Sequence, residues 1–268
     1  MSYRSFTERM KIKINGFFGP LPDPDKWVFI VGCYNSGTTL LHDLLSLQSD
    51  VGVLPDEGQF FTDQFLLPKE QNLPRLWAIE PDKFYLDEYD QNGPNPVKLK
   101  KQWGSLYTDI DKKVLLEKSP TNAARTRWLQ KHFKNAYFIG IIRNGYAVAE
   151  GIRRKAGHSI DVCARQWYES NKIMINDFKH LDNKMLIRYE ELTGNLQAQY
   201  DKILKFIGLK NHSVELENLK LSIHERFSEV RDMNPHSFKN LDNDDIKIIN
   251  AIAGNLMEEF GYPVVKGV

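Results

Sequence analysis

The 268-residue sequence has few cysteines, little net charge and no long hydrophobic run. Its two cysteines, Cys33 and Cys163, are too few for a disulfide framework or a cysteine-rich zinc site, so we expect no metal. Basic residues exceed acidic ones by only one, which argues against a nucleic-acid partner. No apolar run approaches the roughly 18 residues of a membrane span, and the charged N-terminus is unlike a secretory signal. We therefore expect a cytoplasmic protein without a transmembrane segment.

Short apolar runs, each followed by a helical pattern, recur along the chain. The apolar runs predict strands at Trp27–Gly32, Val51–Leu54, Val114–Lys118, Ala136–Arg143 and Met185–Tyr189. Helical patterns occupy Thr38–Gln48, Thr121–His132, Tyr146–Arg154, Leu196–Ile207 and Asp242–Phe260. Strands that alternate with helices predict an α/β fold, with a central parallel sheet flanked by helices.

Residues 66–111 interrupt this alternation and form an insert rich in Pro, Asp and aromatic residues. The aromatic residues are Trp77, Phe84, Tyr85, Tyr89, Trp103 and Tyr107. Such an insert is typical of a lid or a substrate-side wall, where the rings could stack on sugars or planar acceptors. The alternative is an ordinary surface excursion with a small core of its own.

The loop after the first strand, Gly32–Thr39 (GCYNSGTT), resembles the phosphate-binding P-loop in its glycines and final hydroxyl. Successive backbone N–H groups and the start of the following helix favour an anionic group there. Thr38 stands where an NTPase has lysine, and no predicted strand ends in an Asp that could help hold Mg²⁺. The loop therefore favours a shorter, metal-independent phosphate-like group. A P-loop kinase and a simple tight turn are the alternatives.

Four sequence elements, in order, resemble the sulfotransferases that use 3′-phosphoadenosine-5′-phosphosulfate (PAPS). They read NSGTTLL from Asn35, LEKSPT from Leu116, IIRNGYAV from Ile141 and IRYEEL from Ile187. The LEKSPT element is similar to the carbohydrate and tyrosylprotein branches. The resemblance implies one sulfotransferase domain over residues 1–268. Residues 26–65 would contain the 5′-phosphosulfate loop and the base, residues 66–111 the insert, and residues 112–268 the 3′-phosphate and adenine side.

The implied reaction moves a sulfuryl group from PAPS to an acceptor hydroxyl and releases 3′,5′-ADP. Glu57, expected at the carboxyl edge of the sheet, is the candidate base, and Lys118 would stabilise charge on the sulfuryl group. Asp56 and, more distantly, Asp63 compete for the base role, whereas His42 is expected to pack. The residues implied to bind the donor are Asn35, Ser36, Gly37, Thr38, Thr39, Leu40, Arg143, Gly151, Tyr189, Ser237 and Lys239.

Two positions depart from the family pattern. Asn35 stands where the family has a basic residue, and Gly151 stands where a serine binds the 3′-phosphate. Lys118 or a C-terminal lysine could take over the lost charge, and the cluster Arg153–Lys155 is either solvated or part of the anion site. We expect a carbohydrate or glycolipid acceptor, with phenols and peptidyl tyrosine still open. A kinase and a non-catalytic nucleotide-binding protein remain alternatives, and nothing indicates the oligomeric state.

Overall fold

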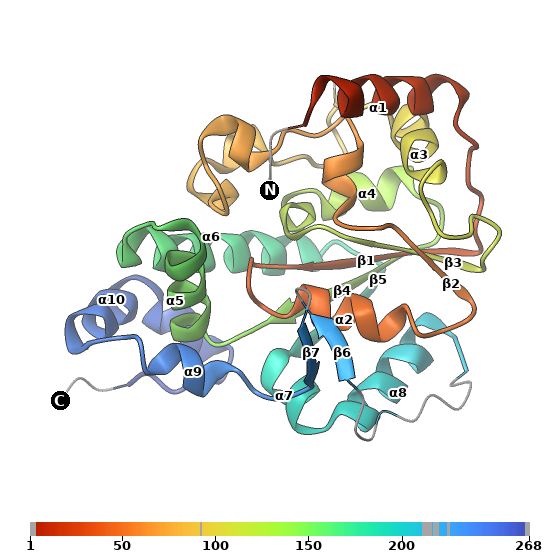
Figure 1. Ribbon diagram of the computed structural model, residues 1–268. Helices are drawn as coiled ribbons and strands as arrows, with labels where there is room; N and C mark the ends of the chain where they lie inside the picture. The colour runs from red at the N-terminus through yellow and green to blue at the C-terminus, as the bar shows by residue number, and fades with distance from the viewer. Residues whose placement is uncertain (1–3, 92, 211–215, 217–219, 224–225, 266–268) are drawn as a thin grey trace.

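A five-stranded parallel sheet lies at the centre of the computed structural model, which describes residues 4–91, 93–210, 216, 220–223 and 226–265. The strand order is β2-β3-β1-β4-β5 (Figure 1). The strands are β1 (Lys26–Gly32), β2 (Val51–Val53), β3 (Val114–Lys118), β4 (Ala136–Ile142) and β5 (Asn183–Arg188). All four pairings between neighbouring strands are parallel. The predicted α/β fold is thus confirmed, and each predicted strand is present with its ends shifted by two residues at most.

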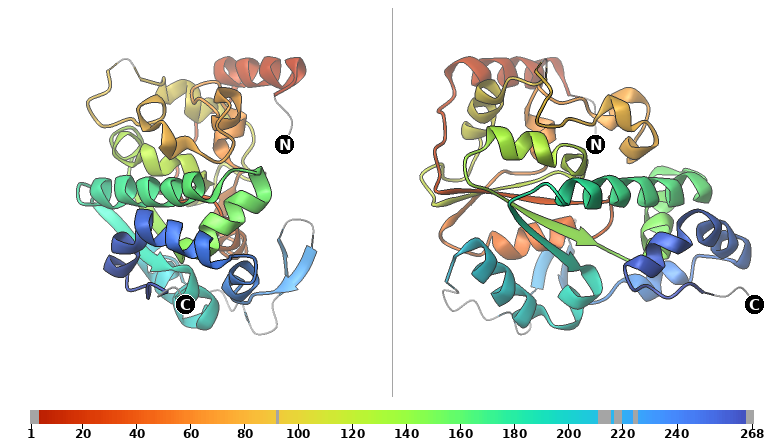
Figure 2. Two further views of the ribbon diagram at one scale, coloured as in Figure 1. Left: turned by 90° about the vertical axis from the view of Figure 1, so that its left-hand side faces the viewer. Right: turned by 180° about the vertical axis from the view of Figure 1, so that it is seen from behind.

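Helices cover both faces of the sheet because successive side chains of β1 point to opposite sides. Trp27 and Phe29 face one buried cluster, and Val28 and Ile30 face the other. The first cluster packs against α3 (Pro96–Gly104), α4 (Thr126–His132) and α6 (Ile160–Phe178). The second packs against α2 (Thr38–Leu45), α7 (Tyr189–Gly194) and α8 (Leu196–Ile207). Figure 2 shows this layered arrangement from behind.

Further helices complete the domain, and two of them are the helices predicted at Tyr146–Arg154 and Asp242–Phe260. At the N-terminus is α1 (Phe6–Phe18), and α5 (Gly145–Ala156), α9 (Asn234–Phe238) and α10 (Asn243–Glu259) gather beyond the carboxyl end of β4 (Figure 1). An antiparallel hairpin pairs β6 (Lys220–Ile223) with β7 (Arg226–Glu229). The 3₁₀ turns are η1 (Gly58–Phe61), η2 (Pro68–Gln71), η3 (Trp77–Ile79), η4 (Pro81–Lys83) and η5 (Pro120–Ala124). Within the described residues, no helix is long and apolar enough to cross a membrane.

The helix predicted over Thr121–His132 is divided into η5 and α4. The break falls at Arg125, whose φ of −138° is not helical. The guanidinium of Arg125 is buried, donates a hydrogen bond to the Phe84 carbonyl and lies 4.1 Å from the Phe65 ring centroid. Tertiary contacts of one buried cation thus override the local helical pattern.

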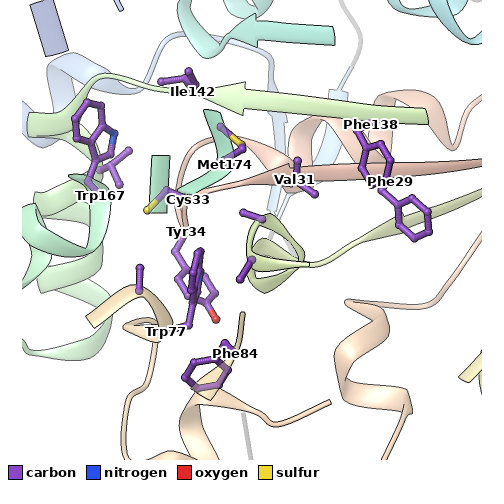
Figure 3. Close-up of a cluster of buried hydrophobic side chains, with 14 of the residues drawn as sticks. Phe29, Val31, Cys33, Tyr34, Trp77, Phe84, Phe138, Ile142, Trp167 and Met174 are labelled. Atoms are coloured by element: carbon purple, nitrogen blue, oxygen red, sulfur yellow. The ribbon is translucent and has the colours of Figure 1, made fainter. Parts of the chain in front are cut away.

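The aromatic residues of the insert contribute to the main core. Trp77, Phe84 and Trp103 are almost fully buried in the cluster that covers Phe29, and Figure 3 shows Trp77 and Phe84 beside Tyr34. The described residues of the insert therefore form no separate core. Because these rings are buried, they cannot stack on an acceptor, which corrects the expectation that they would stack on sugars or planar acceptors. Of the six aromatic residues only Tyr89 is largely exposed.

Candidate active site

The loop between β1 and α2 has the geometry of an anion-binding turn. Asn35 and Gly37 have positive φ values of 63° and 100°. A Cβ on Gly37 would lie 2.7 Å from Cδ2 of Tyr189, so glycine is required both by its φ and by this close approach. Among the described residues no side chain caps the N-terminus of α2, which leaves N–H groups of its first turn available to a ligand.

Two buried polar atoms of this loop have no protein partner among the described residues. They are Oγ of Ser36, whose side chain is fully buried, and Nδ2 of Asn35. Buried polar atoms without partners are rare because each carries a desolvation cost. A phosphate or sulfate oxygen bound in the loop would satisfy them, so the loop residues fit such a group.

A cavity of about 780 Å³ opens beside this loop. It is lined by five basic side chains, from Arg75, Arg143, Arg154, Lys155 and Arg231. Glu57 supplies the one carboxylate among the described lining residues. A concave surface with such an excess of positive charge attracts anionic ligands, although the net charge of the whole chain is only +1.

Arg143 is fixed at the end of β4 by contacts on several sides. Its Nε donates to Asn234 Oδ1 at 2.8 Å, and its Nη1 donates to the Asn35 carbonyl at 2.9 Å. Its guanidinium carbon lies 4.1 Å from the ring centroid of Tyr189. The Tyr189 hydroxyl donates to the Arg231 carbonyl and accepts from the Met233 N–H, each at 3.1 Å. The predicted pair, Arg143 and Tyr189, is thus brought together beside the loop.

Glu57 and Lys118 face each other at the carboxyl ends of β2 and β3. Nζ of Lys118 lies 3.5 Å from Oε1 of Glu57 and 3.8 Å from Oδ1 of Asp56. Gln59 donates to the other oxygen of Glu57 at 2.5 Å. Burial raises the pKa of Glu57, and the Lys118 charge and the Gln59 hydrogen bond partly oppose this rise. A carboxylate poised in this way beside an anion site suits a general base.

Glu117 stabilises the backbone next to Glu57 through hydrogen bonds. Its fully buried carboxylate accepts hydrogen bonds from the Gly58 N–H at 2.9 Å, from Ser119 and from Asn122. Trp103 donates to the Gly58 carbonyl at 2.9 Å. Burial raises the pKa of Glu117 to about 7, against hydrogen bonds that favour its charged form. Since Gly58 directly follows Glu57, these contacts hold the candidate base in place.

The remaining predicted donor-binding residues divide by position. Thr38, Thr39, Leu40, Gly151 and Ser237 line the cavity together with Asn35 and Gly37. Ser36 and Lys118 are buried and are not among the described residues that line the cavity. Lys239, by contrast, is exposed at the end of α9 and is not among the residues that line the cavity.

The other candidates also have clear positions. Asp63 pairs with Lys98 at 2.8 Å, and His42 lies 3.0 Å from Asp43. Neither Asp63 nor His42 is among the described residues that line the cavity. The basic cluster divides: Arg153 pairs with Asp245 at 2.8 Å, whereas the next two residues, Arg154 and Lys155, line the cavity.

Sequence reasoning missed Arg75, Asn234 and Arg231. Asn234 orients Arg143, and Arg231 lines the cavity from the segment after β7. Arg75 reaches the cavity from the insert, where no motif or spacing distinguishes it. Motifs in the sequence could not identify these residues, because tertiary packing alone brings them to the site.

Comparison with known proteins agrees with this geometry. The profile of the Sulfotransferase family matches residues 28–213, well over half of the chain. The protein therefore belongs to the sulfotransferase family, as the resemblance to PAPS-dependent enzymes implied. Among curated proteins, none matches the chain significantly.

Three solved structures show the likeness in fold. The sulfotransferase domain of the Synechococcus PCC 7002 olefin synthase has a TM-score of 0.58 and 17% identity, over 92% of this chain and 99% of that one. The sulfotransferase domain from the curacin biosynthetic pathway gives 0.52 and 18%, over 91% and 100%. Sulfotransferase STF9 from Mycobacterium avium gives 0.54 and 11%, over 96% and 82%. At these identities the likeness concerns the fold alone.

Proposed function

We propose that this protein transfers a sulfuryl group from PAPS to a hydroxyl group of an acceptor. One observation carries the proposal: a single cavity borders the anion-binding loop, the Arg143–Tyr189 pair and the carboxylate of Glu57. The loop alone would fit many phosphate ligands. Its combination with a buried carboxylate–lysine pair at the same sheet edge favours group transfer to a hydroxyl.

The donor would occupy the cavity with its 5′-phosphosulfate in the loop. The N–H groups at the start of α2, together with the hydroxyls of Ser36, Thr38 and Thr39, would surround its oxygens. Arg143 would pair with the 3′-phosphate, for which Ser237 and Lys155 provide further polar groups in the cavity wall. Tyr189 would pack near the adenine.

In the transfer step, Glu57 would accept the proton of the acceptor hydroxyl. The hydroxyl oxygen forms the new S–O bond while the bond between sulfur and the bridging phosphate oxygen breaks, and 3′,5′-ADP leaves with the electron pair. Lys118, 3.5 Å from Glu57, would stabilise negative charge on the transferred group. Positioning and electrostatics would supply most of the catalysis, as in phosphoryl transfer.

For the acceptor we propose a carbohydrate or glycolipid hydroxyl. The likeness of the LEKSPT element to the carbohydrate and tyrosylprotein branches supports this class, and so does a base of the carboxylate type after β2, which the resemblance gives to both branches. The buried insert aromatics no longer contribute to this argument. Simple phenols and tyrosine peptides therefore belong in any acceptor panel.

The donor is tested first by calorimetric titration with 3′,5′-ADP, 5′-AMP and Mg-ATP. We expect 3′,5′-ADP to bind at least about tenfold more tightly than 5′-AMP, because Arg143 gains a charged partner. Tight Mg-ATP binding without a preference for 3′,5′-ADP would instead support a kinase. Radiolabelled PAPS and a panel of glycans, glycolipids, phenols and tyrosine peptides then test transfer. Donor binding without transfer to any acceptor would support a non-catalytic nucleotide-binding protein.

A further inference from the structure

A cation from the insert lies beside the anion-binding loop, although the loop itself contains no basic residue. Nη1 of Arg75 donates to Asn35 Oδ1 at 3.4 Å, and its guanidinium carbon lies 5.5 Å from the Tyr34 ring centroid. Both partners belong to the loop, and Arg75 lines the same cavity. No carboxylate pairs with this guanidinium within the described part of the chain.

The position of Arg75 is set by rigid packing. Its backbone has a φ of 64°, and the two following residues, Leu76 and Trp77, are buried in the main core. On the other side, the Pro74 carbonyl lies 2.8 Å from Nε2 of His158. A charge held by a buried anchor needs little reordering when a ligand arrives, which makes it effective in binding.

The described lining of the cavity has little negative charge to set against its cations, since Glu57 is its one carboxylate. Burial, followed by the nearby charges of Arg75, Arg154 and Arg143, lowers the pKa of Lys155 to about 8. Cations gathered at such close range repel one another unless an anion lies among them. A ligand with a negatively charged group beside Asn35 would relieve that repulsion and would give the Arg75 guanidinium a partner of opposite charge.

We propose that Arg75, which belongs to the insert, binds the 5′-phosphosulfate of the donor. It would thereby provide the positive charge that the loop itself lacks. The proposal rests on the proposed function, because it concerns the same donor. The amide of Asn35 then serves to position the guanidinium rather than to carry charge itself. Arg143 has a separate task, since its Nε and Nη1 are engaged by Asn234 and the loop carbonyl.

The test compares Arg75→Gln with the wild type in titrations with 3′,5′-ADP and with 3′-AMP. A guanidinium on the 5′ group predicts a loss of roughly 10- to 100-fold in affinity for 3′,5′-ADP and no change for 3′-AMP. Lys83→Gln is the matched control, because it removes the same charge from an exposed insert residue that pairs with Glu80. Arg75→Lys keeps the charge and should recover part of the affinity.

Three results would overturn this role of Arg75. They are an unchanged affinity for 3′,5′-ADP, an equal loss for both nucleotides, or a change only in the acceptor KM. If Arg75→Gln fails to fold, the Arg75→Lys variant provides the test instead. Full affinity for the donor together with a raised KM for the acceptor would then assign Arg75 to acceptor binding. A wild-type protein that binds no 3′,5′-ADP would refute the proposed function itself, so the two failures are distinguishable.

An independent observation concerns α1, which exposes an apolar stripe opposite its packed face. Ile12 and Gly16 are the buried residues of α1 and mark its packed face. On its other side, Phe6 is 78% exposed, Phe17 69% and Phe18 86%. The same stripe, which we call the α1 stripe, consists of Phe6, Met10, Ile14, Phe17 and Phe18. So many large apolar side chains gathered on one exposed helix face mark a binding surface.

Lysines border the α1 stripe on both sides. Lys13 lies one turn before Phe17, and Lys11 lies two turns before Phe18, so both stand at its edges. Both lysines are exposed. Aromatic rings flanked by lysines suit the boundary between acyl chains and anionic headgroups.

We infer that α1 docks this protein on an anionic lipid surface. The full chain is sedimented with vesicles of phosphatidylcholine alone or mixed with phosphatidylglycerol. We expect binding only to the mixed vesicles, weakened by salt and reduced roughly tenfold or more by Phe17→Ser with Phe18→Ser. Lys11→Glu with Lys13→Glu should act similarly, and Tyr89→Ser, at another exposed ring, should not.

Two outcomes would contradict the lipid proposal. One is sedimentation with the mixed vesicles that is unaffected by the serine substitutions. The other is a dimer in lipid-free solution that these substitutions dissociate, which would identify a second copy of the chain as the occupant of the α1 stripe. The analytical ultracentrifuge separates the two cases. Transfer to a water-soluble acceptor should be unchanged by these substitutions, because the α1 stripe is not part of the cavity lining.

Discussion

Replacement of Glu57 by glutamine is the most direct perturbation of the proposed chemistry. Glutamine has nearly the same shape, and its carbonyl oxygen can still accept the hydrogen bond from Gln59. Lys118 loses its partner at 3.5 Å but keeps Asp56 at 3.8 Å, so the site should stay assembled. The variant lacks only a group that can take the proton of the acceptor.

The expected loss follows from the role of a general base. Such a base contributes about 10²- to 10⁴-fold, which corresponds to about 3 to 5 kcal/mol of barrier. Affinity for 3′,5′-ADP should be unchanged or slightly higher, because a negative charge is removed from an anion site. Asp56→Asn is the matched control, since it removes the neighbouring carboxylate; it should lose less than about tenfold in kcat.

The pH profile provides a second readout for Glu57. Burial raises the pKa of this carboxyl, and only its deprotonated form can act as the base. The wild-type kcat/KM should therefore fall as the pH drops through this raised pKa, and Glu57→Gln should lack that limb. Rates are measured with saturating radiolabelled PAPS over a range of acceptor concentrations, which gives kcat and kcat/KM at each pH. A variant that keeps more than about a tenth of wild-type kcat, or the same acidic limb, would refute the assignment.

Three further predictions test the surroundings of the site. Arg143→Lys loses the contact with Asn234 and the stacking on Tyr189, so calorimetry should show at least about a tenfold smaller preference for 3′,5′-ADP over 5′-AMP. Tyr189→Phe loses two hydrogen bonds and should lower unfolding stability by about 1–2 kcal/mol in urea titrations. Glu117 has a pKa of about 7 against its usual 4.5, so it binds its proton more tightly in the folded state and its contribution to stability is lost as pH rises through that range. Wild-type stability relative to Glu117→Gln should therefore fall by roughly 3 kcal/mol between those pH values.

The sheet could be predicted because its strands are continuous apolar runs, buried on both faces. β4 (Ala136–Ile142) has almost no polar residue and was located within one residue at its carboxyl end. By contrast α6 (Ile160–Phe178) was missed, although it is the longest helix described. Its polar residues are frequent, and several of them, such as Gln166 and Asn171, are buried and hydrogen-bonded instead of facing solvent. These polar residues interrupt the apolar positions Ile160, Ala164, Trp167 and Met174 on the buried face, and so obscure the stripe on which sequence reasoning depends.

The site could be predicted where function follows strand ends. The loop after β1, Glu57 after β2 and Arg143 after β4 all meet at the carboxyl edge of the parallel sheet, as this topology requires. The aromatic insert was misjudged because composition does not distinguish a ring that stacks on a ligand from one that fills the core. Trp77 and Trp103 are fully buried, and that depends on long-range packing.

The two departures from the family pattern are neighbours in space, and this changes their meaning. A Cβ on Gly151 would lie 3.3 Å from Nδ2 of Asn35, so a serine there would crowd the asparagine side chain. Asn35 in turn contacts Arg75 through its other amide atom. A glycine in α5 thus leaves room for an asparagine in the loop, and that asparagine meets a cation from the insert. In the sequence, Asn35 and Gly151 are two separate losses of donor-binding groups. In the structure they belong to one contact network, which ends in the positive charge of Arg75 at the cavity.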